Sequence, residues 1–216
     1  MSYRIGNRTY PTRTAEVSAA LEAAHTIVWP GQADGGETVS VFRGEDELRS
    51  WLRAAPAPLA EQVARTDELV RGAQALEHTD TERAAFWQDL LTRRIVADVQ
   101  GLAARLGVEE TSAEVLKLAL QGASVLEPPL LHSAILFDRD GCGGAWRPLP
   151  AGVPFPNLSW IGFNDRAGAV RVHGFLALWK NRWFRGRRAF FTGYPLPCLP
   201  LLDVGFDNSA SSALSW

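Results

Sequence analysis

The sequence predicts an α+β protein, with a mainly helical α+β domain over residues 1–128 followed by an all-β domain over residues 131–216. Three observations support this fold class. Apolar residues recur with helical spacing through most of the first part. Beyond Pro128 and Pro129 that spacing vanishes, and glycine, proline and aromatic residues become frequent. The last part also repeats itself internally, as described below.

Strand and helix patterns alternate over the first 55 residues. Thr14 precedes an apolar-periodic run in the position of a helix cap, and turn residues follow the apolar runs that end at Trp29 and Phe42. We expect strands over residues 3–10, 26–29 and 38–42, and helices over residues 14–25 and 45–53.

From Pro58 onward the pattern of the first part is wholly helical. Leu59, Val63 and Val70 share one stripe of a helix that starts there. A capping-box pattern at residues 79–82 opens a second helix, which Gly107 ends, and residues 111–114 open a third that runs to about residue 123. Helices therefore dominate the expected N-terminal domain.

The composition predicts a folded protein, and its charges divide unevenly. Hydrophobic residues make up 46% and charged residues 21%. Residues 1–130 carry 13 Lys+Arg against 19 Asp+Glu, a net charge of −6, whereas residues 131–216 carry 9 against 5, a net charge of +4. We therefore expect the acidic N-terminal and basic C-terminal domains to contact each other. A net charge of +4 does not call for a nucleic-acid partner, and a protein partner stays open.

The sequence has neither an apolar leader at its start nor a run of 18 apolar residues, so we expect a cytoplasmic protein that does not insert into membranes. Export by another route stays open. Cys142 and Cys198 are the only cysteines. They are too few for a disulfide scaffold and lack metal-binding spacing, so we expect two free, half-buried thiols, with a bridge as the alternative if the protein is exported.

Short apolar stretches separated by turn residues give the last third an all-β rhythm. Five of the eight tryptophans lie in this region. We expect strands at six stretches: residues 134–137, 158–163, 169–172, 175–179, 188–191 and 201–206.

Two pairs of segments in this region repeat at nearly constant offset. Phe137-Asp-Arg-Asp-Gly-Cys-Gly-Gly aligns with Trp179-Lys-Asn-Arg-Trp-Phe-Arg-Gly, an offset of 42. Phe163-Asn-Asp-Arg-Ala-Gly-Ala aligns with Phe206-Asp-Asn-Ser-Ala-Ser-Ser, an offset of 43. Two coupled matches of this kind indicate a duplicated unit, with repeats over residues 133–173 and 174–216.

These residues resemble the Greek-key motif of the βγ-crystallin superfamily, in its microbial calcium-binding type. Its first signature is an aromatic residue, four residues, Phe, one residue and Gly. Its second is (Asn/Asp)-(Asn/Asp)-x-x-(Ser/Thr)-Ser, and the second repeat fits both. The resemblance implies a double Greek-key sandwich of two four-stranded sheets, in which each repeat contributes its third strand to the partner sheet. It covers about 40% of the chain and says nothing of residues 1–128.

The resemblance also implies Ca²⁺ sites at one end of the sandwich, because Ca²⁺ takes six to eight oxygen ligands in loose geometry. Each site would combine oxygens of the second signature with a backbone carbonyl after the hairpin aromatic. The implied ligands are Asp207, Asn208, the Ser209 carbonyl and Ser211 from the second repeat, Asn164, Asp165 and the Arg166 carbonyl from the first, and the carbonyls of Asp138 and Lys180.

The first repeat departs from the pattern. Gly168 stands where the hydroxyl ligand is expected, Ala169 replaces the following Ser, and Cys142 replaces the hairpin Phe. We therefore expect one competent Ca²⁺ site and one weakened or empty site, with affinity on the order of micromolar or weaker. The alternative is that these turns are purely structural, because Asx and Ser turns satisfy their own backbone groups without a metal.

No other pattern in the sequence points as clearly to chemistry. Residues 179–188 interleave cations with aromatic rings, as phosphate-binding surfaces do. The hairpin signature accounts for those rings, so we expect solvated arginines that dock on the acidic N-terminal domain. The four histidines have no metal-binding spacing, and the nucleophile-elbow, P-loop and dinucleotide-binding motifs are absent.

The leading hypothesis is therefore a non-enzymatic calcium-binding protein in which the ion stabilises or positions the C-terminal domain. One alternative is a protease-inhibitor or toxin-like module of the same fold, since such modules tend to be exported and disulfide-bonded. Another is an enzyme whose site lies in residues 1–128, for which the sequence offers no catalytic residues.

Overall fold

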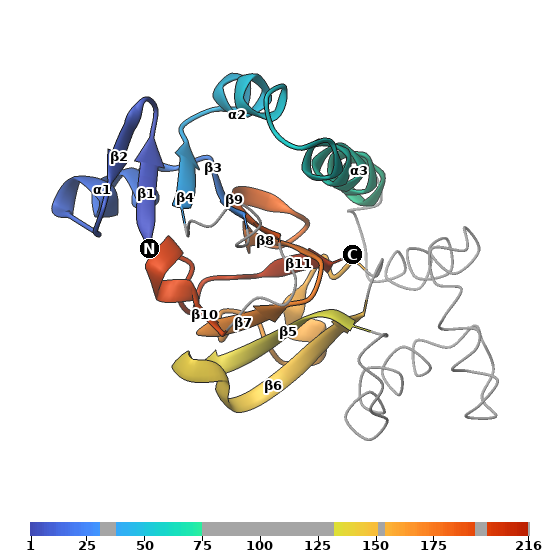
Figure 1. The fold of residues 1–216 in the computed structure, drawn as a ribbon. Helices are drawn as coiled ribbons and strands as arrows, with labels where there is room; N and C mark the ends of the chain where they lie inside the picture. Colours follow the sequence, from blue (N-terminus) through green and yellow to red (C-terminus); the bar gives the residue numbers. More distant parts are fainter. Residues whose placement is uncertain (31–37, 75–131, 151–153, 193–197, 216) are drawn as a thin grey trace, which may run out of the picture.

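The structure is a computed structural model that describes residues 1–30, 38–74, 132–150, 154–192 and 198–215 (Figure 1). The helices in these residues are α1 (Ala15–Ala23), α2 (Glu45–Leu52) and α3 (Ala57–Gln74). The strands are β1 (Ser2–Ile5), β2 (Arg8–Tyr10), β3 (Thr26–Pro30), β4 (Thr38–Phe42), β5 (His132–Arg139), β6 (Gly143–Pro150), β7 (Ala169–Val172), β8 (Phe175–Asn181), β9 (Arg185–Thr192), β10 (Leu199–Pro200) and β11 (Ser212–Ser215). Short 3-10 helices are η2 (Asp140–Cys142), η3 (Leu158–Ile161) and η4 (Leu201–Val204).

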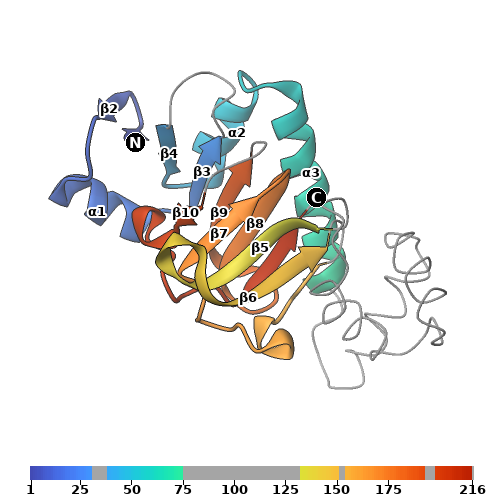
Figure 2. The ribbon, with the colours of Figure 1, turned by 60° about the horizontal axis from the view of Figure 1, so that its bottom comes forward.

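The strands form two sheets. The larger has seven strands in the order β11-β8-β9-β3-β4-β1-β2, and the smaller has four in the order β10-β7-β5-β6. In Figure 2 the small sheet lies against the β8–β9–β11 end of the large one, while α2 and α3 lie along another side of the molecule. None of the described helices is long and apolar enough to cross a membrane.

The two parts of the chain share the large sheet. Strand β3 from the first part pairs in parallel with β9 from the last, from Thr26 opposite Arg188 to Pro30 opposite Thr192. Ile27 and Val28 of β3 are fully buried, as are Phe190 and Phe191 of β9. The sheet and its core therefore continue from residues that begin the chain into residues that end it.

Most of the elements expected before residue 75 are present. The Thr14 hydroxyl accepts a hydrogen bond from the Val17 amide, so Thr14 is the predicted helix cap. The single strand expected over residues 3–10 is instead a hairpin of β1 and β2, because the chain turns at Gly6 with φ +57°. The expected helices over residues 79–107 and 111–123 lie outside the described residues, so the helical dominance of the first part stays a prediction, as does the domain boundary.

Two of the six strands expected in the last part are wrong. Residues 158–163 and 201–206 contain η3 and η4, each ended by a glycine in left-handed conformation, Gly162 at φ +70° and Gly205 at φ +67°. Short apolar runs do not separate buried strands from buried helical turns, and this ambiguity misled the prediction. The sequence did not predict β6, β10 and β11, because β10 has only two residues and the apolar residues of β6 and β11 are sparse.

The two repeats exchange their third extended segments. Strand β10 of the second repeat pairs with β7 of the first, and Phe155 of the first forms a bridge with Ala213 of the second. Both repeats contribute to one core, in which Phe155, Phe163 and Phe206 are fully buried. Each sheet is therefore completed by a residue or strand from the other repeat.

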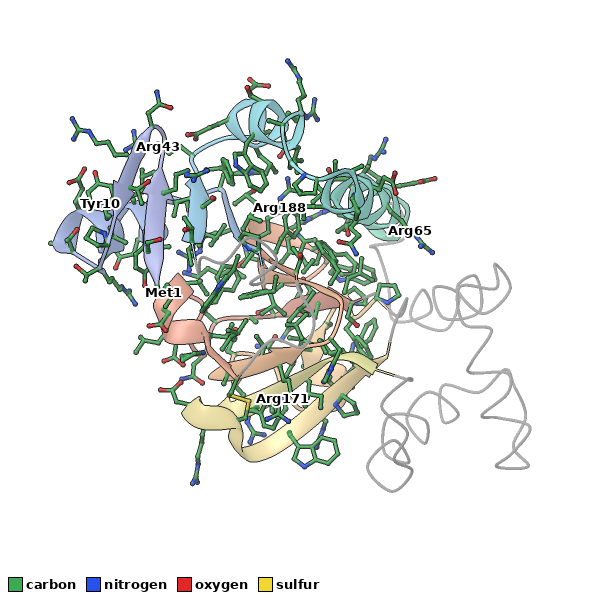
Figure 3. The ribbon with its side chains drawn as sticks, in the orientation of Figure 1. Met1, Tyr10, Arg43, Arg65, Arg171 and Arg188 are labelled. Atoms are coloured by element: carbon green, nitrogen blue, oxygen red, sulfur yellow. A yellow bond between two sulfur atoms is a disulfide. The ribbon has the colours of Figure 1, made fainter. Side chains whose placement is uncertain are left out.

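A charged cluster around Arg188, which is labelled in Figure 3, joins the last part of the chain to helices of the first. Arg188 of β9 donates to Glu45 of α2 at 2.7 Å and to Asp67 of α3 at 2.8 Å. Its Nε donates to the Thr26 hydroxyl of β3 at 3.0 Å. The Arg188 side chain is 11% exposed, so this guanidinium is held between three elements rather than solvated.

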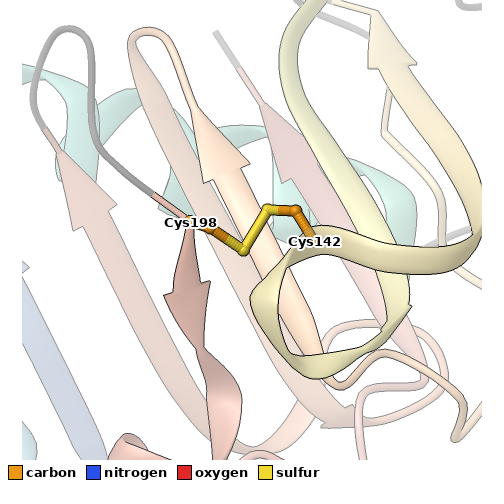
Figure 4. The surroundings of a disulfide bond; sticks show 2 residues. All are labelled: Cys142 and Cys198. Atoms are coloured by element: carbon orange, nitrogen blue, oxygen red, sulfur yellow. A yellow bond between two sulfur atoms is a disulfide. The ribbon is translucent and has the colours of Figure 1, made fainter.

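Cys142 and Cys198 form a disulfide, with their Cα atoms 5.7 Å apart (Figure 4). The prediction of two free thiols is therefore wrong. That prediction weighed only the number and spacing of the cysteines, whereas the fold brings η2 beside the residue that precedes β10. A bridge between residues 56 positions apart restricts the unfolded chain. In the chain-entropy description this stabilises the fold by about 4 kcal/mol.

Candidate metal centre

Two turns of matching geometry carry the predicted ligands. Asp165 has φ +51° in the first repeat, and Asn208, 43 positions later, has φ +46° in the second. Asp and Asn are the residues other than glycine that adopt this left-handed conformation most readily, because their short side chains bond locally. The backbone of each turn thus explains why the second signature requires Asp or Asn at its second position.

The first of two oxygen clusters, here called cup A, joins Asp165, Ser211 and the backbone of Lys180. The Ser211 hydroxyl donates to Asp165 Oδ1 at 3.0 Å. The Asp165 amide donates to the Ala210 carbonyl at 2.9 Å, and the Ser211 amide donates to the Trp179 carbonyl at 2.9 Å. These bonds place Ser211 beside the peptide that follows Trp179. Cup A therefore takes its carboxylate from one repeat and its hydroxyl from the other.

The second cluster, cup B, joins Asn208, Gly168 and the backbone of Asp138 in the mirrored arrangement. The Asn208 amide donates to the Ala167 carbonyl at 2.9 Å, and the Gly168 amide donates to the Phe137 carbonyl at 2.8 Å. A Cβ on Gly168 would lie 3.2 Å from the Asp138 carbonyl oxygen. Position 168 thus faces that carbonyl but, being glycine, supplies no hydroxyl, and the weaker second site stays an expectation.

A cation of the protein lies beside cup B. The Arg166 guanidinium donates to Asp138 Oδ2 at 3.1 Å and lies 5.4 Å from the centre of the Phe163 ring. It also donates to the Gly162 carbonyl at 3.0 Å. The resemblance implies only the backbone carbonyl of Arg166 as a ligand and does not predict this role of its side chain. Its side-chain charge disfavours a metal ion nearby. It engages Asp138 Oδ2, whereas Asp138 Oδ1 is buried with no hydrogen-bond partner among the described residues.

The other predicted residues lie in the same turns. The side-chain amide of Asn164 donates to Asp165 Oδ2 at 2.5 Å, and the side-chain amide of Asn208 donates to Asp207 Oδ1 at 3.1 Å. Among the residues that the structure describes, Asn164 Oδ1 and the Ser209 hydroxyl are buried without a hydrogen-bond partner. Buried oxygens without partners are costly in a native fold and are a reason to expect a bound ion or water.

The chemistry of cup A suits a hard cation. Its side-chain and backbone donors are all oxygens, which Ca²⁺ prefers. Among the described residues, no three His, Cys, Asp or Glu side chains come close enough to hold a metal between them. A site here would therefore rely on one carboxylate, a hydroxyl and backbone carbonyls, with the remaining positions left to water.

The hairpins beside the two cups are held by different means. In the second repeat the Phe184 ring lies edge-on to Trp179 at 5.0 Å, and the Phe184 amide donates to the Ser212 hydroxyl at 3.0 Å. Ser212 donates onward to the Asn181 carbonyl at 2.8 Å. In the first repeat Cys142 occupies the position of that Phe and is bonded to Cys198 instead.

The basic stretch over residues 179–188 does not form a single solvated surface. Arg187 donates to the carbonyls of Leu21 and Gly205. Its guanidinium lies over the Phe206 ring, 4.7 Å from the ring centre. Burial lowers the pKa of Arg187. With Arg188 also paired to acidic residues, two of the cations in this stretch face the first part of the chain, while Lys180 and Arg182 are exposed.

Part of this chain is similar to solved structures of βγ-crystallins. One is a βγ-crystallin from Ciona intestinalis, 25% identical with a TM-score of 0.35, covering 38% of this chain and 98% of its own. A βγ-crystallin from an archaeon is 21% identical with a TM-score of 0.33, covering 38% and 95%. A βγ-crystallin domain from Flavobacterium johnsoniae is 18% identical with a TM-score of 0.31, covering 38% and 91%.

Residues 132–215 resemble a βγ-crystallin domain. These solved βγ-crystallin structures cover 38% of the chain, and the N-terminal region has no recognised family. No protein-family model matches the sequence, and no curated protein matches it. The large sheet of the βγ-crystallin-like part also continues through β3 into the first part of the chain, whereas the expected form has two four-stranded sheets.

Proposed function

We propose that the βγ-crystallin-like part binds one Ca²⁺ ion at cup A and that the ion stabilises the domain. The observation that carries this proposal is the 3.0 Å approach of the Ser211 hydroxyl to Asp165 Oδ1 across the two repeats. Both groups are ligands that the resemblance implies. They come from turns whose second residues share a left-handed conformation. In the absence of an ion the Ser211 hydroxyl bonds to the Asp165 carboxylate. When Ca²⁺ binds, both groups would turn their oxygens toward the ion.

Stabilisation follows from where the ligands originate. Asp165 belongs to the first repeat, and Ser211 and Lys180 belong to the second. An ion at cup A therefore links the two repeats, and it binds only where the fold brings them together. A ligand that binds only the folded state adds about 2.7 kcal/mol to stability at 100 times its dissociation constant.

We propose a single site because cup B is deficient in two ways. Gly168 supplies no hydroxyl, and the Arg166 guanidinium is paired with Asp138 beside the cup. Each deficiency weakens binding independently, one by removing a ligand and the other by offsetting the negative charge of Asp138 beside the cup. Calorimetric titration of the calcium-free protein should therefore give a stoichiometry near one.

The test compares Ser211→Ala with the wild type. After chelation, excess Ca²⁺ should raise the melting temperature of the wild type, and Ser211→Ala should lose most of that rise. Asp165→Asn should weaken binding further, because it removes the only carboxylate in cup A. Asp140→Ala is the control, since Asp140 is an exposed acid of the first hairpin and belongs to neither cup.

The proposal fails if Ca²⁺ shifts neither the melting temperature nor the tryptophan fluorescence of the wild type. A shift of equal size in Ser211→Ala would place the ion elsewhere. Mg²⁺ serves as the selectivity control, because it demands octahedral geometry and keeps its waters, so it should shift the melting temperature less than Ca²⁺ at the same concentration.

As a second candidate we propose an exported inhibitor module of the same fold. The Cys142–Cys198 disulfide favours it, because disulfides persist mainly in oxidising compartments. Incubation of the full chain with serine, cysteine and metalloproteases would test it. Tight inhibition of one class would support this candidate, and no inhibition at a tenfold excess of protein would exclude it for those classes.

A further inference from the structure

The disulfide closes a ring of three segments around cup B. Cys142, at the end of η2, is bonded to Cys198 just before β10. From there the Leu201 amide donates to the Gly168 carbonyl at 2.8 Å, and the Gly168 amide donates to the Phe137 carbonyl at 2.8 Å. The first hairpin, residues 137–144, is thus tied to the 198–201 segment and to the turn that ends at Gly168.

The bond is accessible to a reductant. Cys142 and Cys198 are both only partly buried, and η2 lies at the end of a hairpin (Figure 4). Exchange requires that a thiolate reach one of the two sulfurs. A partly exposed bridge at a hairpin end meets this requirement better than one enclosed in a core.

The second repeat provides a redox-independent counterpart. Its hairpin, residues 179–186, is closed by the Trp179–Phe184 ring contact, and the Phe184 side chain is 4% exposed. Ser212 bonds both the Phe184 amide and the Asn181 carbonyl. None of these contacts involves a sulfur atom. The chain therefore carries two corresponding hairpins, one closed by an aromatic contact and the other bonded through a disulfide to the 198–201 segment.

We propose that Cys142–Cys198 is a redox latch whose reduction releases the first hairpin and weakens Ca²⁺ binding by the domain. A dithiol reductant gives two electrons and two protons to the bridge, which becomes two cysteine thiols while the reductant becomes a disulfide. The part that concerns Ca²⁺ rests on the proposed function. The release of the hairpin does not.

The link to cup A runs through the first-repeat turn. Asp165 lies in the turn between Gly162 and Gly168, and Gly168 is bonded to both other members of the ring. When the bridge opens, the Gly168 end of that turn is held by two hydrogen bonds without the covalent tie. Asp165 is then less firmly placed opposite Ser211, so the ion meets a less preorganised set of ligands.

Amide hydrogen exchange of the full chain, oxidised or reduced with a dithiol, tests the latch without calcium. Reduction should speed exchange at residues 137–144 about tenfold or more and leave residues 179–186 unchanged. Cys198→Ser should show fast exchange at the first hairpin without reductant. A double variant with Cys142→Phe and Cys198→Ala restores the family's aromatic hairpin, and its exchange should not respond to the dithiol.

Calcium titration of the same samples tests the second step. The dissociation constant of the wild type should rise severalfold on reduction, and that of the double variant should not change. Unchanged exchange at residues 137–144 after confirmed reduction overturns the latch. Faster exchange with an unchanged dissociation constant overturns the link to calcium. Faster exchange with no calcium bound in either redox state overturns the proposed function and leaves the latch standing.

Discussion

Arg188 connects elements from opposite ends of the sequence. It contacts Glu45 and Asp67 from two helices and Thr26 from β3. Replacing it with alanine removes the cation that joins the two carboxylates, while Glu45 keeps its pairing with the exposed Arg49. We expect Arg188→Ala to lower the free energy of unfolding by about 2–3 kcal/mol, less than the roughly 3–5 kcal/mol of a fully buried pair. The expected loss of unfolding free energy is smaller than for a fully buried pair because the two carboxylate side chains are 33% and 34% exposed.

Arg49→Ala is the matched control for that measurement. Arg49 also pairs with Glu45, at 3.4 Å, but its side chain is 67% exposed. We expect its loss to cost about 0.3–0.5 kcal/mol in urea unfolding. Equal effects of the two variants would show that the Arg188 cluster is no more than a surface ion pair.

Asp203 of η4 gives a second expectation for a single residue, this time in its pH dependence. Burial raises the pKa of Asp203 above its ordinary value, with attraction to Arg13 opposing the rise. An acid whose pKa is raised by folding contributes stability below its unfolded pKa, and that stability is lost as pH rises through the folded pKa. Asp203→Asn should therefore raise the melting temperature near pH 7 and make little difference below about pH 3. A larger gain at low pH would contradict this cause.

The role of a single residue was predictable from the sequence where that role depends only on residues nearby in the chain. The left-handed Asp165 and Asn208 follow from the repeated signature, because the conformation is a property of the turn itself. The pairing of Cys142 with Cys198 and the position of Arg166 beside Asp138 do not. Both depend on contacts between segments distant in sequence, which spacing alone does not reveal.

At the scale of elements, the two hairpins of the βγ-crystallin-like part differ in how they are closed. Ser212 is fully buried and bonds to two backbone groups of the second hairpin. Ser212→Ala would leave the Phe184 amide buried without a partner. We expect it to lower the free energy of unfolding by about 1–3 kcal/mol. Chemical unfolding without calcium measures this cost apart from any loss of metal.

Ser159→Ala is the control for Ser212→Ala, since Ser159 is exposed at η3. Its effect should stay within about 0.5 kcal/mol. Together with Ser211→Ala, these variants separate two neighbouring serines by role. The change at Ser211 should alter calcium affinity more than stability, and the change at Ser212 should do the reverse. Similar profiles for both would contradict the assignment.

Helices and strands were predictable where the spacing of the apolar residues agrees with the capping and turn residues at the ends of the run. The helix after Thr14 and the strands that end near Trp29 and Phe42 follow from a cap, an apolar run and a turn. At residues 158–163 and 201–206 the spacing of the apolar residues does not distinguish a strand from a helical turn. Each of these runs forms an apolar helical turn of four residues that packs against the core. Length and hydrophobicity are then the same for strand and turn, and only the glycine that follows separates them.

At the scale of the whole molecule, the seven-stranded sheet was not predictable from the sequence. A parallel pair such as β3 and β9 joins residues more than 150 positions apart. The sequence of neither strand indicates which strand it pairs with, because each contains a buried apolar run that would suit many partners. The charge difference between the two parts predicted attraction, but it does not specify that a strand of one part would extend a sheet of the other.

The shared sheet leads to an expectation about cooperativity. Strands β3, β8 and β9 exchange ladder hydrogen bonds, and their buried residues belong to one core. If these strands open together, a mutation in β3 must destabilise β8 and β9 equally. Ile27→Ala removes a fully buried side chain of β3 and should lower the global opening free energy by about 2–4 kcal/mol. Amide exchange should report the same loss in residues 26–30, 175–181 and 185–192.

Arg4→Ala serves as the control because Arg4 lies on an exposed position of β1 in the same sheet. Its opening free energy should match the wild type within about 0.5 kcal/mol. If Ile27→Ala lowers protection in β3 while β8 and β9 keep their wild-type values, the βγ-crystallin-like part unfolds on its own. The parallel pairing of β3 with β9 would then be a docking contact between two separately stable units.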